Sequence, residues 1–297
     1  MFGGIEAGGT KFVCVIGTGP AAIVATKRIE VGDPAETIGA ARNFFLEALA
    51  EGMQLDAIGI GSFGPLELRH GHPRYGCITT TPKAGWSGTD MVGPFASGLG
   101  VPIEFDTEVN AAALAEGRWG AARGLRSFIY LTLGTGVSGG AVVDGRLVHG
   151  LGHPEMGHIA VERRADDVFA GVCPFHGDFF EGMASGTAVA ARFGRRAEAL
   201  EGADRDAAIS IIAFYLAVGV RSLVYVLSHE RIVVGGGLSA VPGLATAARA
   251  ELVTQLAGHP GLPEHGEPVF LEPAALGSMA GPLGTLILAA QAQRCRS

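Results

Sequence analysis

The first third of the chain alternates short apolar runs with one longer run in which apolar residues recur every three or four positions. The short runs have the length and β-branched content of strands, and the longer run has the spacing of one face of a helix. The first two runs enclose Ala7-Gly8-Gly9-Thr10, which predicts a hairpin with a glycine-rich turn. The elements predicted in this part are strands at 2–6, 11–16, 57–60 and 101–105 and helices at 34–49 and 110–119.

The same order of elements begins again after residue 127. Two further strand-like runs enclose Gly134-Thr135-Gly136-Val137-Ser138, so a strand, a glycine and threonine turn and a strand occur twice in the chain. A later apolar run opens into Gly235-Gly236-Gly237. The elements predicted here are strands at 128–133, 139–143, 146–149 and 231–234 and helices at 187–199, 206–227 and 284–293.

Strands that alternate with helices in two similar halves predict an α/β protein of two domains flanking a cleft. The break between the halves is expected at residues 117–124, where glycines follow the alanine-rich helix. This gives a small N-terminal α/β domain at 1–117 and a large C-terminal α/β domain at 118–283. The last helix, at about 284–297, is expected to pack back on the small domain.

Composition and charge narrow the functional classes. The 297 residues are 48% hydrophobic and 17% charged, with a net charge of −7, and no cluster of basic residues offers a track for a nucleic-acid backbone. The longest apolar stretch, 211–220, is interrupted by Arg221 and is shorter than the ~20 residues that cross a bilayer. Four widely spaced cysteines, and the lack of a signal-peptide pattern after Met1, predict a reduced, cytoplasmic protein.

The glycine-rich turns are the first candidates for chemistry. Gly134-x-Gly136-x-x-Gly139 matches a dinucleotide-binding fingerprint, but a strand follows it where that fingerprint requires a helix. One such turn is more often an ordinary hairpin, whereas two of them favour a nucleotide held between two domains, since backbone N–H groups and threonine hydroxyls bind phosphate. The candidate nucleotide-binding residues are Gly8, Gly9, Thr10, Lys11, Gly134, Thr135, Gly136, Gly235, Gly236 and Gly237.

These segments carry a resemblance to a known family. Residues 4–11, 133–140 and 232–237 resemble, in this order, the phosphate and adenosine segments of ROK-family sugar kinases. Ser62-Phe63-Gly64-Pro65-Leu66 and the segment from Tyr75 to Lys83 resemble the fructokinase branch of that family in particular. The resemblance implies the actin-like ATPase fold, also called ribonuclease H-like, in both domains.

The resemblance also implies an activity. It indicates an ATP-dependent hexose kinase, of the fructokinase type, that converts D-fructose to fructose 6-phosphate with ATP and Mg²⁺. Glu6 stands where many relatives have an aspartate and is expected to orient Mg²⁺ through water. A kinase for glucose, mannose or an amino sugar is the alternative, and a catalytically degenerate sugar-binding protein is a second. Sugar and ATP are the expected partners, and a homodimer is the expected assembly.

Phosphoryl transfer to a sugar hydroxyl needs a carboxylate that accepts the proton of that hydroxyl. Asp106-Thr107-Glu108-Val109-Asn110 lies between a predicted strand and a predicted helix, where acids are also common because they suit the first turn of a helix. Matched from Asn110 and the helix, the resemblance implies that Glu108 takes the place of the family's catalytic aspartate. Glutamate is one methylene longer, and Asp106 is the substitute if Glu108 cannot reach.

Further residues are implied as sugar ligands. By residue type alone, Glu155 and Glu181 are ordinary surface acids. Carboxylates also accept hydrogen bonds from pairs of sugar hydroxyls. The resemblance implies that Gly64, Glu155, His158 and Glu181 contact the sugar.

A possible metal site overlaps these residues. The family's structural zinc is held by the histidine matched here by His158 and by a Cys-x-x-His-x-x-Cys segment, of which Cys173 and His176 match two positions. Phe179 occupies the position of the last cysteine, so three ligands are present where a closed structural site uses four. Asp166, Asp167, Asp178 or water would have to supply the fourth ligand. One thiolate is lost, and phenylalanines that can pack against one another surround the site, so we expect zinc to be weakly held or absent.

Overall fold

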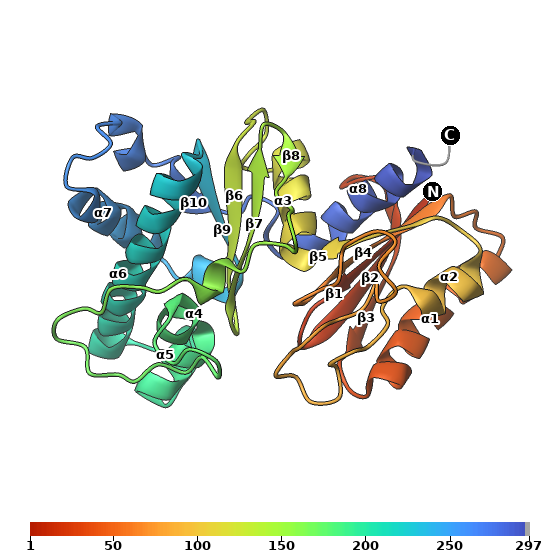
Figure 1. The fold of residues 1–297 in the computed structure, drawn as a ribbon, viewed down its shortest axis with the longest axis horizontal. Helices are drawn as coiled ribbons and strands as arrows, with labels where there is room; N and C mark the ends of the chain where they lie inside the picture. The colour runs from red at the N-terminus through yellow and green to blue at the C-terminus, as the bar shows by residue number, and fades with distance from the viewer. Residues whose placement is uncertain (295–297) are drawn as a thin grey trace. The chain divides into compact units, whose positions relative to one another are not determined.

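The computed structural model describes residues 1–294, which form two compact units. Unit 1 consists of Met1–Ala115, Val148–His153 and the chain from Ser278, and unit 2 consists of Glu116–Leu147 and Pro154–Gly277. Cys295 and the end of the helix predicted to reach 297 lie outside the described residues. Each unit contains one five-stranded mixed sheet with helices packed against it (Figure 1), which confirms the predicted α/β class.

The sheet of unit 1 has the strand order β3-β2-β1-β4-β5. The first three strands are antiparallel neighbours, and β4 and β5 continue the sheet parallel to β1. Sequence analysis missed β3 because polar and charged side chains interrupt its apolar positions. The strands are β1 (Phe2–Ala7), β2 (Lys11–Gly17), β3 (Ile23–Glu30), β4 (Ala57–Ser62) and β5 (Ile103–Thr107).

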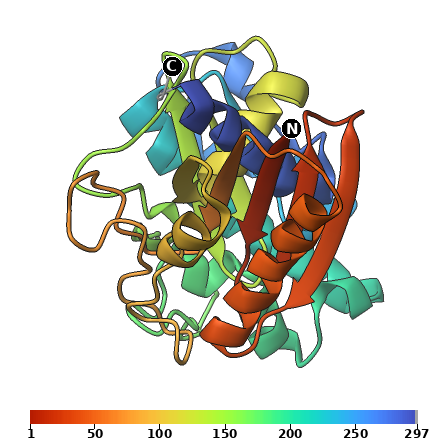
Figure 2. The same ribbon diagram turned by 90° about the vertical axis from the view of Figure 1, so that its right-hand side faces the viewer.

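Helices cover both faces of this sheet (Figure 2). On one face lie α1 (Pro34–Ala50) and the adjoining α2 (Gly93–Leu99). The carboxylate of Asp33 caps the start of α1 by accepting hydrogen bonds from the backbone N–H groups of residues 35 and 36. On the other face lies α8 (Ala280–Arg294). The helix that follows β5 is α3 (Glu108–Trp119).

Glycines in two strands allow α8 to approach the sheet closely. A β-carbon on Gly4 of β1 would overlap the side chain of Thr285, and one on Gly59 of β4 would overlap the backbone oxygen of the same residue. Thr285 is fully buried, and its hydroxyl donates a hydrogen bond to the carbonyl of Pro282 within α8. The backbone of α8 therefore rests directly on β4 at Gly59, and at Gly4 only the small side chain of Thr285 separates the helix from β1.

The sheet of unit 2 has the order β10-β9-β6-β7-β8, with β6 and β7 as an antiparallel hairpin and β9 parallel to β6. Predicted helix 187–199 is shorter than expected because Gly194 adopts a left-handed conformation that ends it. The strands are β6 (Phe128–Leu133), β7 (Val137–Val143), β8 (Arg146–Leu147), β9 (Arg231–Gly235) and β10 (Leu271–Pro273). The helices are α4 (Phe180–Ala184), α5 (Gly186–Phe193), α6 (Gly202–Leu227) and α7 (Leu244–Leu256).

Helix α6 is the most apolar long element of the described chain. Its 26 residues have the length and hydropathy of a membrane span, but 61% of its most apolar window is buried inside the protein. It packs against α7 and α4 (Figure 1). These contacts are those of a core helix, because neighbouring elements of the protein cover its apolar surface.

Candidate active site

The glycine turn of unit 1 joins β1 to β2. The N–H of Gly8 donates to the carbonyl of Lys11 over 3.0 Å, and Gly9 and Thr10 at the tip are exposed. A β-carbon on Gly9 would meet no other atom within 4 Å, so the space beside this turn is open. The turn can therefore accept a ligand against its backbone without moving other groups.

Glu6 lies one residue before the end of β1, next to this turn. Burial raises the pKa of its carboxyl to about 7, and the charge of Lys11 opposes the shift. A nearby cation would return the carboxylate to its charged form. Magnesium commonly takes one or two protein carboxylates and completes its shell with phosphate oxygens and water, so Glu6 beside an open turn fits this ion.

The ends of three parallel strands bring the candidate residues of unit 1 to one edge of the sheet. Ala7 of β1 is in register with Ser62 of β4, which is in register with Thr107 of β5. The chain continues from these three positions into the glycine turn, the loop that contains Gly64 and the helix that begins at Glu108. The candidate phosphate turn, sugar loop and base therefore lie along one sheet edge.

Asp106 and Glu108 have different surroundings. Asp106 is 5% exposed, and its Oδ1 accepts hydrogen bonds from the Thr107 N–H and the Asn110 side-chain amide, both over 2.7 Å. Its Oδ2 lies 2.9 Å from Nε2 of His149. Both oxygens are thus engaged within unit 1. Glu108 is half-buried at the first position of α3 and keeps more exposure to solvent.

In unit 2 the second glycine turn is fixed from two sides. The Gly186 N–H at the start of α5 donates to the carbonyl of Gly134 over 2.7 Å, and the hydroxyl of Thr187 donates to the carbonyl of Thr135 over 2.8 Å. Gly236 follows β9 with φ +81, and a β-carbon there would overlap the backbone of Leu133. The Gly134–Gly136 turn and the Gly235–Gly237 segment therefore adjoin at one end of neighbouring strands.

The candidate sugar ligands of unit 2 gather beside the same hairpin. Glu181 in α4 accepts a hydrogen bond from the Val137 N–H over 3.1 Å, and a β-carbon on Gly136 would overlap its carboxylate. Burial raises the pKa of Glu155 to about 7, and the negative charge of Glu181 adds to the shift. These two carboxylates thus lie close enough to interact, as acceptors for adjacent hydroxyls would.

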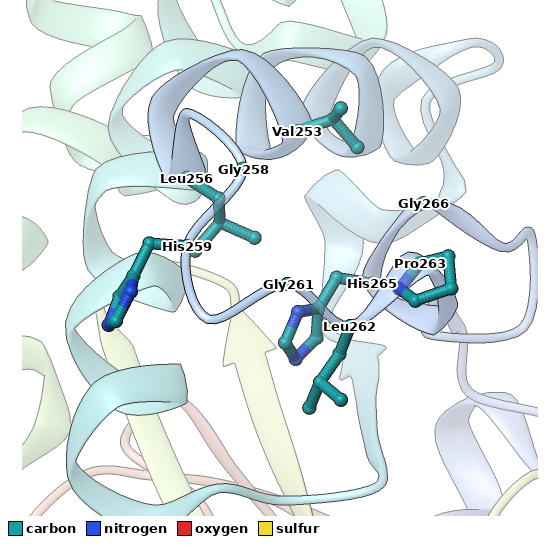
Figure 3. A pocket seen from close by; sticks show the side chains of 9 residues that line it. All are labelled: Val253, Leu256, Gly258, His259, Gly261, Leu262, Pro263, His265 and Gly266. Atoms are coloured by element: carbon teal, nitrogen blue, oxygen red, sulfur yellow. The ribbon is translucent and has the colours of Figure 1, made fainter.

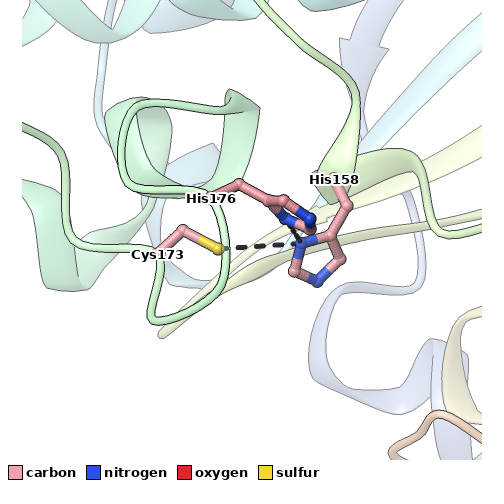
Figure 4. A group of neighbouring side chains, drawn as sticks. All are labelled: His158, Cys173 and His176. Atoms are coloured by element: carbon pink, nitrogen blue, oxygen red, sulfur yellow. Dashed lines mark hydrogen bonds between the residues drawn. The ribbon is translucent and has the colours of Figure 1, made fainter.

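The three candidate metal ligands are close together (Figure 4). Their ligand atoms lie within 4.8 Å of one another, with 3.1 Å between the Nδ1 atoms of His158 and His176 and 3.7 Å from the Cys173 sulfur to His158 Nδ1. The ring of Phe179 stacks on that of His176, with centroids 4.6 Å apart and an interplanar angle of 12°. An apolar ring therefore fills one side of the cluster.

The acids considered as fourth ligands are held by arginines. Asp166 pairs with Arg164, and Asp178 pairs with Arg163, each over 2.6 Å. Asp167 is buried, where it binds both Nη atoms of Arg192 and the hydroxyl of Tyr215. Within residues 1–294 the cluster contains no fourth protein ligand, so the residues present do not fit a closed four-ligand zinc site.

A separate pocket of about 290 Å³ lies beside α7 (Figure 3). Its lining is largely apolar, with Leu256, Leu262 and Pro263 beside the rings of His259 and His265. None of the predicted site residues lines it. The pocket therefore contributes nothing to the candidate active site.

Comparison with known proteins places the chain in a family. A sequence model described as the ROK family matches residues 2–292. The chain belongs to the ROK family. This confirms the resemblance inferred from the glycine segments.

Relatives and a solved structure add detail to this membership. A fructokinase of Zymomonas mobilis is 42% identical over 99% of this chain and 97% of its own. Five relatives named fructokinase or putative fructokinase reach 34–42% identity, whereas a Streptomyces coelicolor glucokinase is 28% identical over 52% of this chain and 48% of its own. A ROK glucokinase of Streptomyces griseus, solved with glucose and AMPPNP, is 25% identical, with a TM-score of 0.77 over 98% of this chain and 99% of that chain.

Sequence reasoning missed two histidines in unit 1. His149 contacts Asp106, and Nε2 of His153 accepts a hydrogen bond from the Leu66 N–H over 3.0 Å. The only local signal was the presence of two histidines between the second hairpin and Glu155. Their partners lie 43 and 87 residues away in the sequence, so no local pattern could identify them.

Proposed function

We propose that the chain is an ATP-dependent fructokinase, which transfers the γ-phosphoryl group of ATP to the 6-hydroxyl of D-fructose. The observation that carries the proposal is that relatives named fructokinase match this chain at higher identity and over a greater length than a glucokinase does. Those named fructokinase match nearly the whole chain, and the glucokinase matches about half of it at lower identity. The geometry is compatible, since a glycine turn, a sugar loop and a carboxylate share one sheet edge in unit 1.

In this proposal Glu108 is the base that accepts the proton of the attacking hydroxyl. The surroundings of Asp106 support this assignment, because that carboxylate is buried and both its oxygens already accept hydrogen bonds. A base must have an oxygen within hydrogen-bond reach of the substrate. Glu108, which is half-buried at the first position of α3, meets this requirement better than the buried Asp106.

The nucleotide would bind to the glycine segments of both units. Gly8, Gly9, Thr10 and Lys11 in unit 1, and Gly134, Thr135 and Gly136 in unit 2, would hold the phosphates, and Gly235–Gly237 would line the adenosine end. Glu6 would orient Mg²⁺ through water, and the ion would neutralise phosphate charge during transfer. Gly64, Glu155, His158 and Glu181 would contact the sugar.

We also propose that zinc is weakly held or absent. The stacked ring of Phe179 and the arginine pairs of Asp166, Asp167 and Asp178 support this. His158, Cys173 and His176 would then bind zinc at most with water as the fourth ligand, and packing of aromatic rings would fix the loop that contains them.

The domains predicted at 1–117 and 118–283, with the last helix returning to the first, would close on the sugar to exclude water. The compact units of the structure differ from these bounds, since residues 116–117 belong to unit 2 and residues 148–153 and 278–283 belong to unit 1. The protein would act as a cytoplasmic homodimer with sugar and ATP as its small-molecule partners.

A coupled assay with purified protein tests the proposed function. Adding glucose-6-phosphate dehydrogenase with and without phosphoglucose isomerase distinguishes fructose 6-phosphate from glucose 6-phosphate as the product. We expect kcat/KM for fructose to exceed that for glucose, mannose and an amino sugar when the rates are compared through ADP release, coupled to pyruvate kinase and lactate dehydrogenase. A glucose value tenfold above the fructose value, about 1.4 kcal/mol of transition-state preference, would instead assign the protein to the glucokinases. Fructose binding without turnover would indicate the degenerate sugar-binding alternative, and the Glu108→Gln variant controls for contaminating kinases.

A further inference from the structure

A short segment of the chain, residues 148–153, belongs to unit 1 although the chain on both sides of it belongs to unit 2. It follows β8, has no regular secondary structure and ends before Pro154. A turn closed by a 2.9 Å hydrogen bond from the Gly150 N–H to the Gly152 carbonyl separates its two histidines. These histidines form hydrogen bonds to two different parts of the proposed active site.

His149 completes a network around Asp106. A carboxylate can only accept, so Nε2 of His149 donates to Oδ2 of Asp106 over 2.9 Å. The hydrogen bond to Asp106 raises the pKa of His149, burial opposes the shift, and Glu104 adds a smaller attraction. Asn110 directs its amide N–H to the same carboxylate, which leaves its Oδ1 buried with no partner among the described residues. The network thus joins the end of β5 to the first turn of α3.

His153 holds the other loop. Its Nε2 accepts the hydrogen bond from the Leu66 N–H, so this nitrogen carries no proton. A β-carbon on Gly64 would lie 3.2 Å from the ring, which shows that the imidazole packs against the backbone of the loop. The segment therefore presents a donor to the β5–α3 turn and an acceptor to the Gly64–Leu66 loop.

We propose that the 148–153 segment positions the catalytic and the sugar-binding parts of unit 1 separately. His149, through Asp106, fixes the turn that contains Glu108, and His153 fixes the loop that contains Gly64. Both are positioning residues, since neither is argued to touch substrate. The inference rests on the proposed function for the identity of the base and the sugar loop, whereas the two contacts themselves do not depend on it.

The test compares leucine and glutamine at each histidine. Leucine removes the polar atom, while glutamine places an amide N–H or carbonyl oxygen close to the position of Nε2. We expect His149→Leu to lower kcat about tenfold, because small displacements of a reacting group are costly, and to leave KM for fructose within twofold. We expect His153→Leu to raise KM for fructose about tenfold with kcat within twofold. The glutamine variants should stay within threefold of wild type in both constants.

Amide hydrogen exchange gives a readout that needs no activity. The Leu66 amide should exchange at least tenfold faster in His153→Leu than in wild type and regain protection in His153→Gln. The Thr107 amide should behave in the same way with the two variants of His149. His259→Leu in unit 2 is the matched control for a histidine-to-leucine change and should alter neither amide.

The outcomes separate the inference from the proposed function. If wild-type protein lacks hexose kinase activity but the variants show these exchange changes, the proposed function is wrong and the positioning contacts are supported. Active protein in which leucine and glutamine have equal effects, or in which each leucine variant changes kcat and KM together, would overturn the positioning role. Unchanged exchange at both amides would overturn it whatever the activity.

Discussion

Glu108→Gln and Asp106→Asn are expected to have opposite consequences, although each replaces a single carboxylate oxygen by an amide group. Glu108 is half-buried at the start of α3, where an acid contributes ~0.3–1 kcal/mol through the helix dipole. Its replacement should therefore change the free energy of unfolding by less than ~1 kcal/mol. It should lower kcat by ~10²–10⁴-fold, which is the usual contribution of a positioned general base.

Asp106→Asn should mainly reduce stability. The carboxylate accepts three hydrogen bonds, of 2.7, 2.7 and 2.9 Å, and a hydrogen bond to a charged group contributes ~1.5–3 kcal/mol. Asparagine keeps one oxygen for Thr107 and Asn110 but turns its amide toward His149 and loses the charge. Because the His149 side chain is 38% exposed to solvent, we expect a loss near the lower end of this range, about 1.5–2 kcal/mol. Any loss of kcat should be about tenfold, through displacement of Glu108.

Urea denaturation and steady-state kinetics on the two variants decide the matter. Wild type and Glu108→Asp serve as references, since the shorter acid tests whether the length of the glutamate side chain is needed. If Asp106→Asn abolishes turnover at unchanged stability while Glu108→Gln remains active, Asp106 is the base and the reasoning from its engaged oxygens is wrong.

Three further predictions follow from other contacts. Glu181→Gln should lower the pKa of Glu155, because burial and the Glu181 charge together raise it to about 7. In wild type, KM for fructose should increase as pH falls through 7 and Glu155 becomes protonated. In the variant this increase should occur at lower pH, and an unchanged KM–pH profile would contradict the prediction. Asp167→Asn should cost about 3–5 kcal/mol in urea denaturation, since it leaves Arg192 buried beside no carboxylate. Burial opposes ionisation of Asp167, but hydrogen bonds from Arg192 and Tyr215 hold its pKa well below the ordinary value. The stability difference between wild type and variant should therefore be complete above the unfolded-state pKa of ~3.9 and shrink as pH falls below it. Metal analysis after EDTA dialysis should find less than one zinc per chain, and Phe179→Cys should raise that content by supplying a second thiolate; one tightly held zinc in wild type would mean that a fourth ligand exists.

Local patterns predicted those parts of the fold that depend on local interactions. The two hairpins, the strand before Asp106 and the helix after it were predicted because apolar periodicity and glycine turns act over a few residues. Strand β3 was missed because every second residue along it is exposed and polar side chains dilute its pattern. The assignment of residues 148–153 to unit 1 depends on partners distant in the sequence, which no window of that length reveals.

The candidate site also has features that local sequence predicts and features that depend on contacts between distant residues. The order of glycine turn, sugar loop and acid could be predicted because the segments follow strands, and parallel strands bring those positions to one edge. That both oxygens of Asp106 are engaged could not be predicted, because this depends on His149, which lies 43 residues away in the sequence. The engagement of Asp166, Asp167 and Asp178 by arginines likewise follows from tertiary packing, and it removes candidates that residue type alone had suggested.

The close packing of α8 against Gly4 and Gly59 affects how the protein can fold during translation. The ribosome delivers the strands that contain these glycines first and α8 only after all of unit 2, so one face of the first sheet stays uncovered for most of translation. Unit 2 has all its strands before α8 emerges and can fold during synthesis. Completion of unit 1 has to wait for contacts between the two ends of the chain, which makes it the slower step and the stage most exposed to aggregation.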